Sequence, residues 1–176
     1  MPLVLFLYLR RNSAPRRTMG RMAVALRAYD PRDFSALFRL DHSCFAEGIS
    51  YSKSTLRYFL ELPSSDCVVA EDGKRIVGFV LSEENPPLAH IITLDVAETH
   101  RRQGAGSSLL AEMERNLTLR GVRTILLETA IDNEPAVAFW KRHGYRIEAV
   151  LKRYYLRRLD AYEMRKRLLA SPATTP

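Results

Sequence analysis

Three observations predict a single mixed α/β domain. The chain has 176 residues, a length that suits one domain with one sizeable hydrophobic core. From residue 23 onward, short apolar runs alternate with segments of helical periodicity. Neither an internal repeat nor a long linker interrupts this alternation. We therefore assign residues 23–170 to one domain, with residues 1–22 as an N-terminal extension and 171–176 as a flexible tail.

The first half of the domain begins with a strand and two helices. Asp30 and Pro31 have the residue types of a helix cap and first turn, and apolar residues follow at helical spacing. Asp72-Gly73 is a hairpin-turn dipeptide between two apolar runs. The expected elements are a strand at 24–27, a helix after Asp30, a helix capped by Ser52, and strands at 67–70 and 76–81.

The second half repeats the alternation with clearer boundaries. An apolar run at 89–96 predicts a buried strand, and the helix after it ends at Gly121, a typical C-terminal cap. A strand is expected at 124–130. Asn133 is a good N-cap for a helix that ends at Gly144. Two further strands, near 145–152 and 161–168, complete the domain.

Charge and cysteine content exclude several classes of protein. The formal net charge is +7, but residues 1–22 contain five arginines and no acidic residue. The domain itself therefore lacks the strong positive charge of a nucleic-acid-coating protein, and we expect no nucleic-acid partner. The two cysteines, Cys44 and Cys67, lie in apolar surroundings without metal-ligand spacing. We interpret them as reduced core residues of a cytoplasmic protein.

The N-terminal extension resembles neither a membrane span nor a secretory signal. Its apolar run, 3–9, is too short to cross a bilayer, and its arginines follow that run instead of preceding it. The simplest interpretation is an upstream start codon, with Met19 or Met22 beginning the domain. A peripheral membrane tether is the alternative, and no stable membrane association is expected.

The segment 101–106, Arg-Arg-Gln-Gly-Ala-Gly, is the most informative stretch of the chain. Two glycines between a strand and a helix expose the first backbone N–H groups of that helix, which bind anions with help from the helix dipole. A dinucleotide-binding fingerprint would need glycine at Leu109, and the Gly-Lys-Ser/Thr of a P-loop is absent. The loop therefore predicts a phosphate or pyrophosphate site of another kind.

A second motif makes the prediction more specific. The glycine loop is followed by Asn-x-x-Ala-x-x-Phe-aromatic-x-x-x-Gly-aromatic at 133–145. Together the two motifs resemble the GNAT superfamily of acetyl-CoA-dependent N-acetyltransferases, and the resemblance covers roughly residues 23–168. It implies a twisted, mostly antiparallel central sheet with helices on both faces, acetyl-CoA as the acyl donor, and no metal. The four histidines show no metal-ligand spacing either.

Within that superfamily, the chain resembles most the ribosomal-protein-alanine N-acetyltransferase (RimI-like) branch. The matching segments are Cys44–Ser52, the pair Tyr154-Tyr155, and 160–164. This branch modifies protein N-termini, so the resemblance implies direct acetyl transfer to an N-terminal α-amino group. A small-molecule amine acetyltransferase and a non-catalytic acyl-CoA-binding domain remain alternatives. Either a monomer or a homodimer fits the sequence.

The resemblance also assigns residues to the cofactor. The backbone of Leu94, Asp95 and Val96 would bind the pantetheine arm as an added strand does. Asn133 and Trp140 would contact the cofactor from the following helix. The pyrophosphate would lie against the loop and the start of its helix, which comprise Arg101, Arg102, Gln103, Gly104, Ala105, Gly106 and Ser107.

The catalytic assignments are Glu128 and Tyr154. The resemblance places the general base at Glu128, with Asp95 as the other carboxylate available. The family usually has tyrosine where this chain has Trp140, and an indole N–H is no usable acid. Tyr154 or Tyr145 would then protonate the thiolate, or the thiolate would leave unassisted because its pKa is near 8.5.

Overall fold

The computed structural model describes residues 24–45 and 49–168. A seven-stranded sheet forms its centre, in the order β1-β2-β3-β4-β5-β7-β6, and all neighbours are antiparallel except β4 and β5. The strands are β1 (Ala25–Ala28), β2 (Ser65–Asp72), β3 (Arg75–Asn85), β4 (Leu88–Val96), β5 (Thr124–Ala130), β6 (Arg146–Tyr155) and β7 (Leu159–Arg167).

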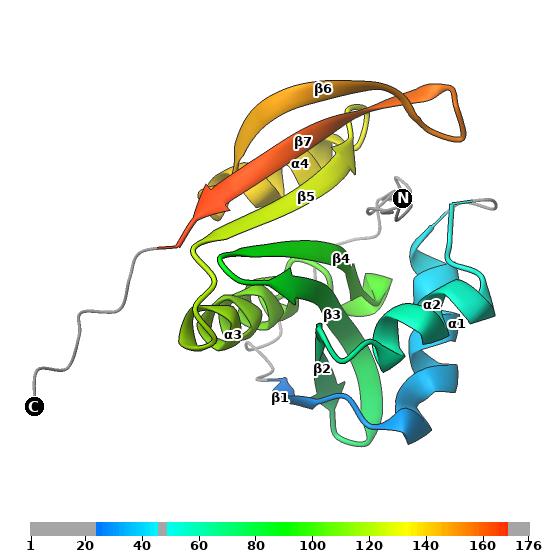
Figure 1. The fold of residues 1–176 in the computed structure, drawn as a ribbon. Helices are drawn as coiled ribbons and strands as arrows, with labels where there is room; N and C mark the ends of the chain where they lie inside the picture. The colour runs from blue at the N-terminus through cyan, green and yellow to red at the C-terminus, as the bar shows by residue number, and fades with distance from the viewer. Residues whose placement is uncertain (1–23, 46–48, 169–176) are drawn as a thin grey trace, which may run out of the picture.

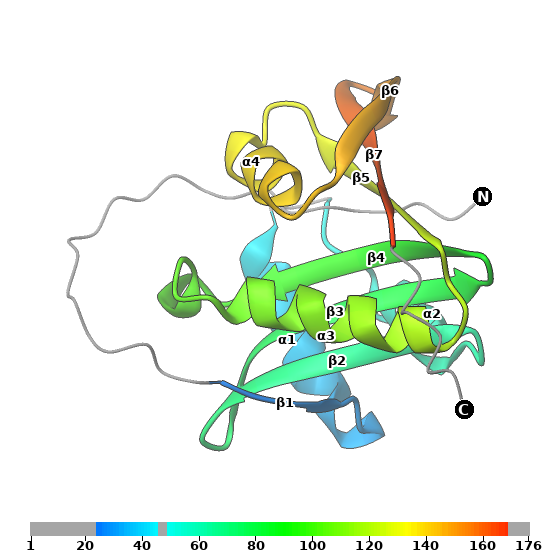
Figure 2. The ribbon, with the colours of Figure 1, turned by 90° about the vertical axis from the view of Figure 1, so that its left-hand side faces the viewer.

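Helices cover both faces of this sheet. One face carries α1 (Phe34–Cys44) and α2 (Lys53–Glu61), and the other carries α3 (Ala105–Leu119) and α4 (Glu134–Arg142). Figure 2 shows α3 lying along the strands with α1 behind them. The predicted fold class is thereby confirmed.

Most predicted boundaries are confirmed by capping interactions. The Asp30 side chain caps a short 3-10 turn that leads into α1, and Ser52 Oγ accepts the Thr55 N–H at the start of α2. Two predictions needed correction. At the β2–β3 turn, Asp72 pairs with Arg75, so Gly73 (φ 60°) is the first central residue of the turn. Strand β6, expected to end near residue 152, runs on to Tyr155, because its pairing with β7 resumes there after a bulge.

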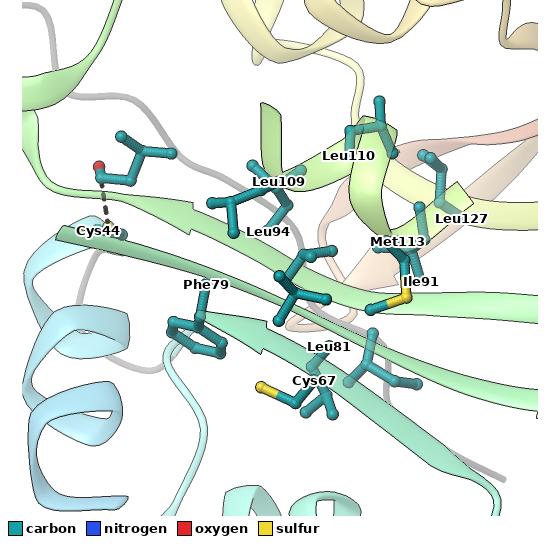
Figure 3. Packing of buried hydrophobic residues seen from close by; sticks show 14 of the residues in the cluster. Cys44, Cys67, Phe79, Leu81, Ile91, Leu94, Leu109, Leu110, Met113 and Leu127 are labelled. Atoms are coloured by element: carbon teal, nitrogen blue, oxygen red, sulfur yellow. Dashed lines mark hydrogen bonds between the residues drawn. The ribbon is translucent and has the colours of Figure 1, made fainter. Parts of the chain in front are cut away.

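The core lies on both faces of the sheet. On the α3 face, Leu109 and Met113 pack against Leu94 and Ile91 of β4 (Figure 3). Cys44 and Cys67 are buried free thiols, and burial raises the pKa of Cys44 to about 12. The prediction of reduced core cysteines agrees with this environment.

The feature that positions the site is a separation between β4 and β5. The two strands pair only at Leu88–His90 with Thr124–Leu126, although β4 continues to Val96 and β5 to Ala130. A bulge at Ile92, where Thr93 pairs with Leu81 and Ile91 with Ser82, bends β4 at this point. Both strands therefore present backbone edges to the space between them.

The described helices include none that is long and apolar enough to span a bilayer. The predicted N-terminal extension, the C-terminal tail, and residues 46–48 of the segment Cys44–Ser52 lie outside the described residues.

Candidate active site

The glycine loop ends in a helix N-terminus that no side chain caps. Gly104 is the N-cap of α3 and has φ 98°, a left-handed conformation that glycine adopts at little cost. Arg102 is exposed and also left-handed, with φ 61°. The first-turn N–H groups of α3 thus point away from the helix beside a positive charge, which is the arrangement of an anion site.

Two of the predicted loop residues use their side chains within the protein. Arg101 Nε donates to the Val96 carbonyl at 2.9 Å, and Gln103 Nε2 donates to the Thr99 carbonyl at 2.6 Å. The first bond ties the loop to the end of β4, and the second ties it to the turn at Glu98–His100. An anion would therefore meet the backbone of this loop and the Arg102 guanidinium, with Arg101 and Gln103 shaping the loop.

Ser107 joins α3 to the end of α4. His143 Nδ1 lies 2.8 Å from the Phe139 carbonyl, and His143 Nε2 lies 3.0 Å from Ser107 Oγ. Because a carbonyl only accepts hydrogen bonds, Nδ1 carries a proton and donates to the Phe139 carbonyl, and Nε2 shares a hydrogen bond with the Ser107 hydroxyl. The backbone N–H of Ser107 then remains as its donor to an anion.

Two buried polar groups lie on β5 and at the start of α4. Asn133 Oδ1 accepts the Ala136 N–H at 3.3 Å, which confirms its role as N-cap. Its Nδ2 is buried and bonds to none of the described residues, and the same is true of Thr129 Oγ1. Buried polar groups normally have partners. These two groups therefore fit a polar ligand between β4 and β5, and Thr129 was not foreseen from the sequence.

Glu128 lies on β5 on the face opposite the glycine-loop helix. Its Oε2 is 2.9 Å from His90 Nε2 of β4, and 8% of the glutamate is exposed. A shallow groove opens beside His90, with Glu83 and Leu126 among the residues that line it. His90 could not be assigned from the sequence, because only the parallel pairing of β4 with β5 brings it beside Glu128. The Glu128–His90 pair can therefore accept a proton beside the place where β4 and β5 separate.

Asp95 occupies a different environment. It is fully buried, accepts from Thr93 Oγ1 at 3.0 Å, and lies close enough to Asp41 of α1 for the two charges to interact. Burial, and next the Asp41 charge, raise the pKa of Asp95 well above its usual value. A fully buried carboxyl group whose environment favours its neutral form is poorly placed to take a proton from a substrate. This environment favours Glu128 over Asp95, whose backbone stays a candidate for cofactor binding.

Asp41 anchors the chain that follows residues 46–48. It is fully buried, and its Oδ2 accepts the Tyr51 N–H at 2.9 Å. His42 Nδ1 lies 3.4 Å from the same oxygen. The Tyr51 hydroxyl donates to the Ile92 carbonyl at the β4 bulge, at 3.3 Å. Asp41 thus joins α1 to the chain that leads into α2.

This environment makes stability dependent on pH. Burial raises the pKa of Asp41 from 3.8 to about 7. The native state then binds the proton more tightly than the unfolded chain, so this contribution to stability is lost as pH rises from 3.8 through about 7. The expected loss is on the order of a few kcal/mol, because a tenfold change in proton affinity corresponds to about 1.4 kcal/mol. We expect Asp41→Asn, which keeps an acceptor for Tyr51, to flatten this dependence in urea unfolding measured at mildly acidic and mildly alkaline pH. Parallel pH profiles for the variant and the wild type would contradict the assignment.

The aromatic candidates differ in burial. Trp140 is fully buried, and its ring centroid lies 5.0 Å from Phe139 and 5.1 Å from Tyr145. Tyr145 is also buried, and its hydroxyl donates to Glu114. Burial, with the Glu114 charge, raises the pKa of Tyr145 well above 10.0, so it is a poor acid. Tyr154 is partly exposed and therefore remains the candidate phenol.

These features define an α/β protein with an uncapped helix N-terminus on one side of a split sheet and a glutamate–histidine pair on the other. The model of the acetyltransferase (GNAT) family matches residues 34–145. The chain belongs to this family and is an acetyltransferase. Within the described residues, no three His, Cys, Asp or Glu side chains gather as a metal site would require.

Individual relatives agree with this assignment. N-alpha-acetyltransferase 30 of Schizosaccharomyces pombe is 32% identical over 117 residues, which cover 64% of this chain and 78% of that protein. The ribosomal-protein-S18-alanine N-acetyltransferase of Escherichia coli has the same fold, with TM-score 0.77 and 20% identity, over 88% of this chain and 99% of that one. Arabidopsis thaliana NAA60, solved with acetyl-CoA, gives TM-score 0.73 and 22% identity over 83% of this chain and 99% of that one.

Proposed function

We propose that this protein transfers an acetyl group from acetyl-CoA directly to the N-terminal α-amino group of a protein, in a ternary complex. One observation carries the proposal: Glu128 pairs with His90 where β4 and β5 separate, across the sheet from the uncapped end of α3. The relative in Schizosaccharomyces pombe is named as an N-alpha-acetyltransferase, which supports this acceptor class. The two free, buried cysteines support a cytoplasmic location.

The residues around the split sheet fit acetyl-CoA, the ligand of the Arabidopsis relative. The N–H groups at the start of α3 and Arg102 would hold its pyrophosphate. The β4 edge at Leu94–Val96, Thr129 and the Asn133 amide would bind the amide-rich pantetheine arm. When bound, acetyl-CoA supplies an acetyl thioester.

The chain's own contribution to the chemistry is proton removal. An α-amino group has a pKa of about 8 and begins mostly protonated at neutral pH. Glu128 would take that proton directly or through one water, with His90 holding the carboxylate in place. On the thiolate side, Tyr154 would supply the proton, or the thiolate would depart unassisted.

The test is acetyl-CoA turnover against peptides that vary in their first residues, beside a panel of polyamines and aminoglycosides. Turnover of peptides at the α-amino group, identified by mass spectrometry, is the expected result. Turnover of the small amines alone would instead establish a small-molecule acetyltransferase. Binding of acetyl-CoA without any turnover would establish a non-catalytic domain.

The two glycines that flank α3 test the cofactor site. Gly104 (φ 98°) precedes the helix and Gly121 (φ 90°) follows it, so alanine is strained at both positions to a similar degree. We expect Gly104→Ala to weaken acetyl-CoA binding by roughly tenfold to a hundredfold, since charge-assisted hydrogen bonds contribute about 1.5–3 kcal/mol.

Gly121→Ala is the matched control, because it carries the same backbone strain away from the anion site. It should lower the melting temperature while leaving acetyl-CoA affinity unchanged in calorimetry. Equal affinities in the two variants would remove the N-terminus of α3 from the cofactor site.

A further inference from the structure

The tip of the β6–β7 hairpin is strongly basic. Lys152, Arg153, Arg157 and Arg158 are all exposed there. Lys152 Nζ pairs with Asp160 at 2.7 Å, whereas the three arginines form no ion pair with any other described residue. Because no described carboxylate forms an ion pair with them, these guanidinium groups are available to an external anion.

The backbone of this tip is strained. Leu156 (φ 51°) and Arg157 (φ 57°) are left-handed at the centre of the turn, where the Arg158 N–H donates to the Tyr155 carbonyl at 3.0 Å. Arg153 (φ 53°) is left-handed in the bulge, where its N–H donates to Asp160. Asn-Gly is the usual choice for such a turn, and other residues cost about 1–2 kcal/mol each. Strain of this kind is typical of functional segments.

The tip lies next to the proposed acceptor site. Strand β7 pairs with β5 so that Glu163 is opposite Glu128 and Ala161 opposite Ala130. The Ile131 N–H then donates to the Asp160 carbonyl, so the tip extends past the end of β5, as Figure 1 shows. At about 3.3 Å per strand residue, the base of the tip is roughly 10 Å from Glu128.

Resting on the proposed function, we propose that this tip selects acceptor proteins that carry acidic side chains a few residues after the N-terminus. An extended peptide advances about 3.3 Å per residue, so with its amine at Glu128 its third to fifth residues would reach the tip. Arginine guanidinium groups bind carboxylates in a bidentate manner. The charges favour the same orientation of the peptide. Glu83 lies opposite His90 in the β3–β4 pairing, so a negative charge lies near the bound amine, whereas the arginines lie near the later residues of the peptide.

An acidic peptide fits the tip better than RNA does. Non-specific RNA binding needs an extended basic surface with aromatic platforms, and the net charge outside residues 1–22 is small. The tip offers three guanidinium groups over one turn, which matches two or three carboxylates of a peptide.

The test uses the full chain and three peptides that differ only at residues 3–5, with glutamate, glutamine or lysine there. We expect kcat/KM for the glutamate peptide to exceed that for the glutamine peptide by at least about tenfold. The difference should come from a lower KM and should shrink strongly as the salt concentration rises. The double variant Arg157→Glu/Arg158→Glu should invert the preference toward the lysine peptide. Arg75→Glu is the matched control, since Arg75 is exposed and unpaired among the described residues at the distant β2–β3 turn, and it should leave the preference unchanged.

A second variant separates selection from turn stability. Arg157→Gly relieves the left-handed strain, so it should raise the melting temperature while lowering the preference for glutamate. Equal rates for all three peptides, or an unchanged preference in the double variant, would overturn the inference and leave the proposed function intact. Turnover of small amines only would overturn both. A double variant that loses affinity for single-stranded RNA, with the same peptide preference, would assign the tip to RNA.

Discussion

Replacing Glu128 with glutamine should lower kcat by about 10² to 10⁴-fold, the usual loss when a general base is removed. The substitution preserves shape and the hydrogen bond to His90, so acetyl-CoA affinity and the melting temperature should stay near wild type. The deficit should shrink as pH rises, because more of the acceptor amine is then already neutral. Steady-state kinetics from neutral to alkaline pH measure kcat, and calorimetry measures the affinity for acetyl-CoA.

Two companion variants make the result specific. His90→Gln should cost less than Glu128→Gln if His90 only holds the carboxylate in place. Asp95→Asn should change kcat little, because the Asp95 carboxyl group is fully buried and its environment favours the neutral form. Wild-type turnover in Glu128→Gln, together with a large loss in Asp95→Asn, would transfer the role of base to Asp95.

Trp140→Ala should destabilise the protein by roughly 3–5 kcal/mol, the range for deletion of a buried tryptophan. The indole is fully buried between Phe139 and Tyr145 at the end of α4, so its loss leaves a cavity beside the proposed cofactor site. Urea unfolding measures the stability, and kcat measures misplacement of the thioester. Trp140→Phe keeps the aromatic packing and should retain much of the stability and of kcat. An equal loss in Trp140→Ala and Trp140→Phe would contradict a packing role.

A double-mutant cycle then tests the acid. Trp140→Tyr restores the phenol that the family usually has, and we expect activity at least equal to wild type if the cavity accepts the smaller ring. If Tyr154 is the acid, Tyr154→Phe should be damaging in the wild type and milder beside Trp140→Tyr. Equal losses in both backgrounds would show that neither phenol donates the proton and that the thiolate leaves unassisted.

The order of elements could be predicted from the sequence because the signals are local. Apolar periodicity, the caps at Asp30, Ser52 and Asn133, and the glycines after α3 and α4 each act over a few residues. The fold class, the uncapped start of α3 and the buried cysteines followed from these patterns. The length of β6 could not be predicted from local patterns, because its bulge depends on Asp160 of the neighbouring strand β7.

By itself the sequence determined the order of the elements, the uncapped start of α3 and the acetyltransferase family. The tertiary structure decided which side chains meet: His90 beside Glu128, Asp41 close to Asp95, and Ser107 with His143. Each of these contacts joins residues of different elements, and each depends on strand register or helix packing. Register is set by pairing across the whole sheet, and a shift of one residue would turn Glu128 to the other face. Local sequence patterns therefore do not predict the strand register.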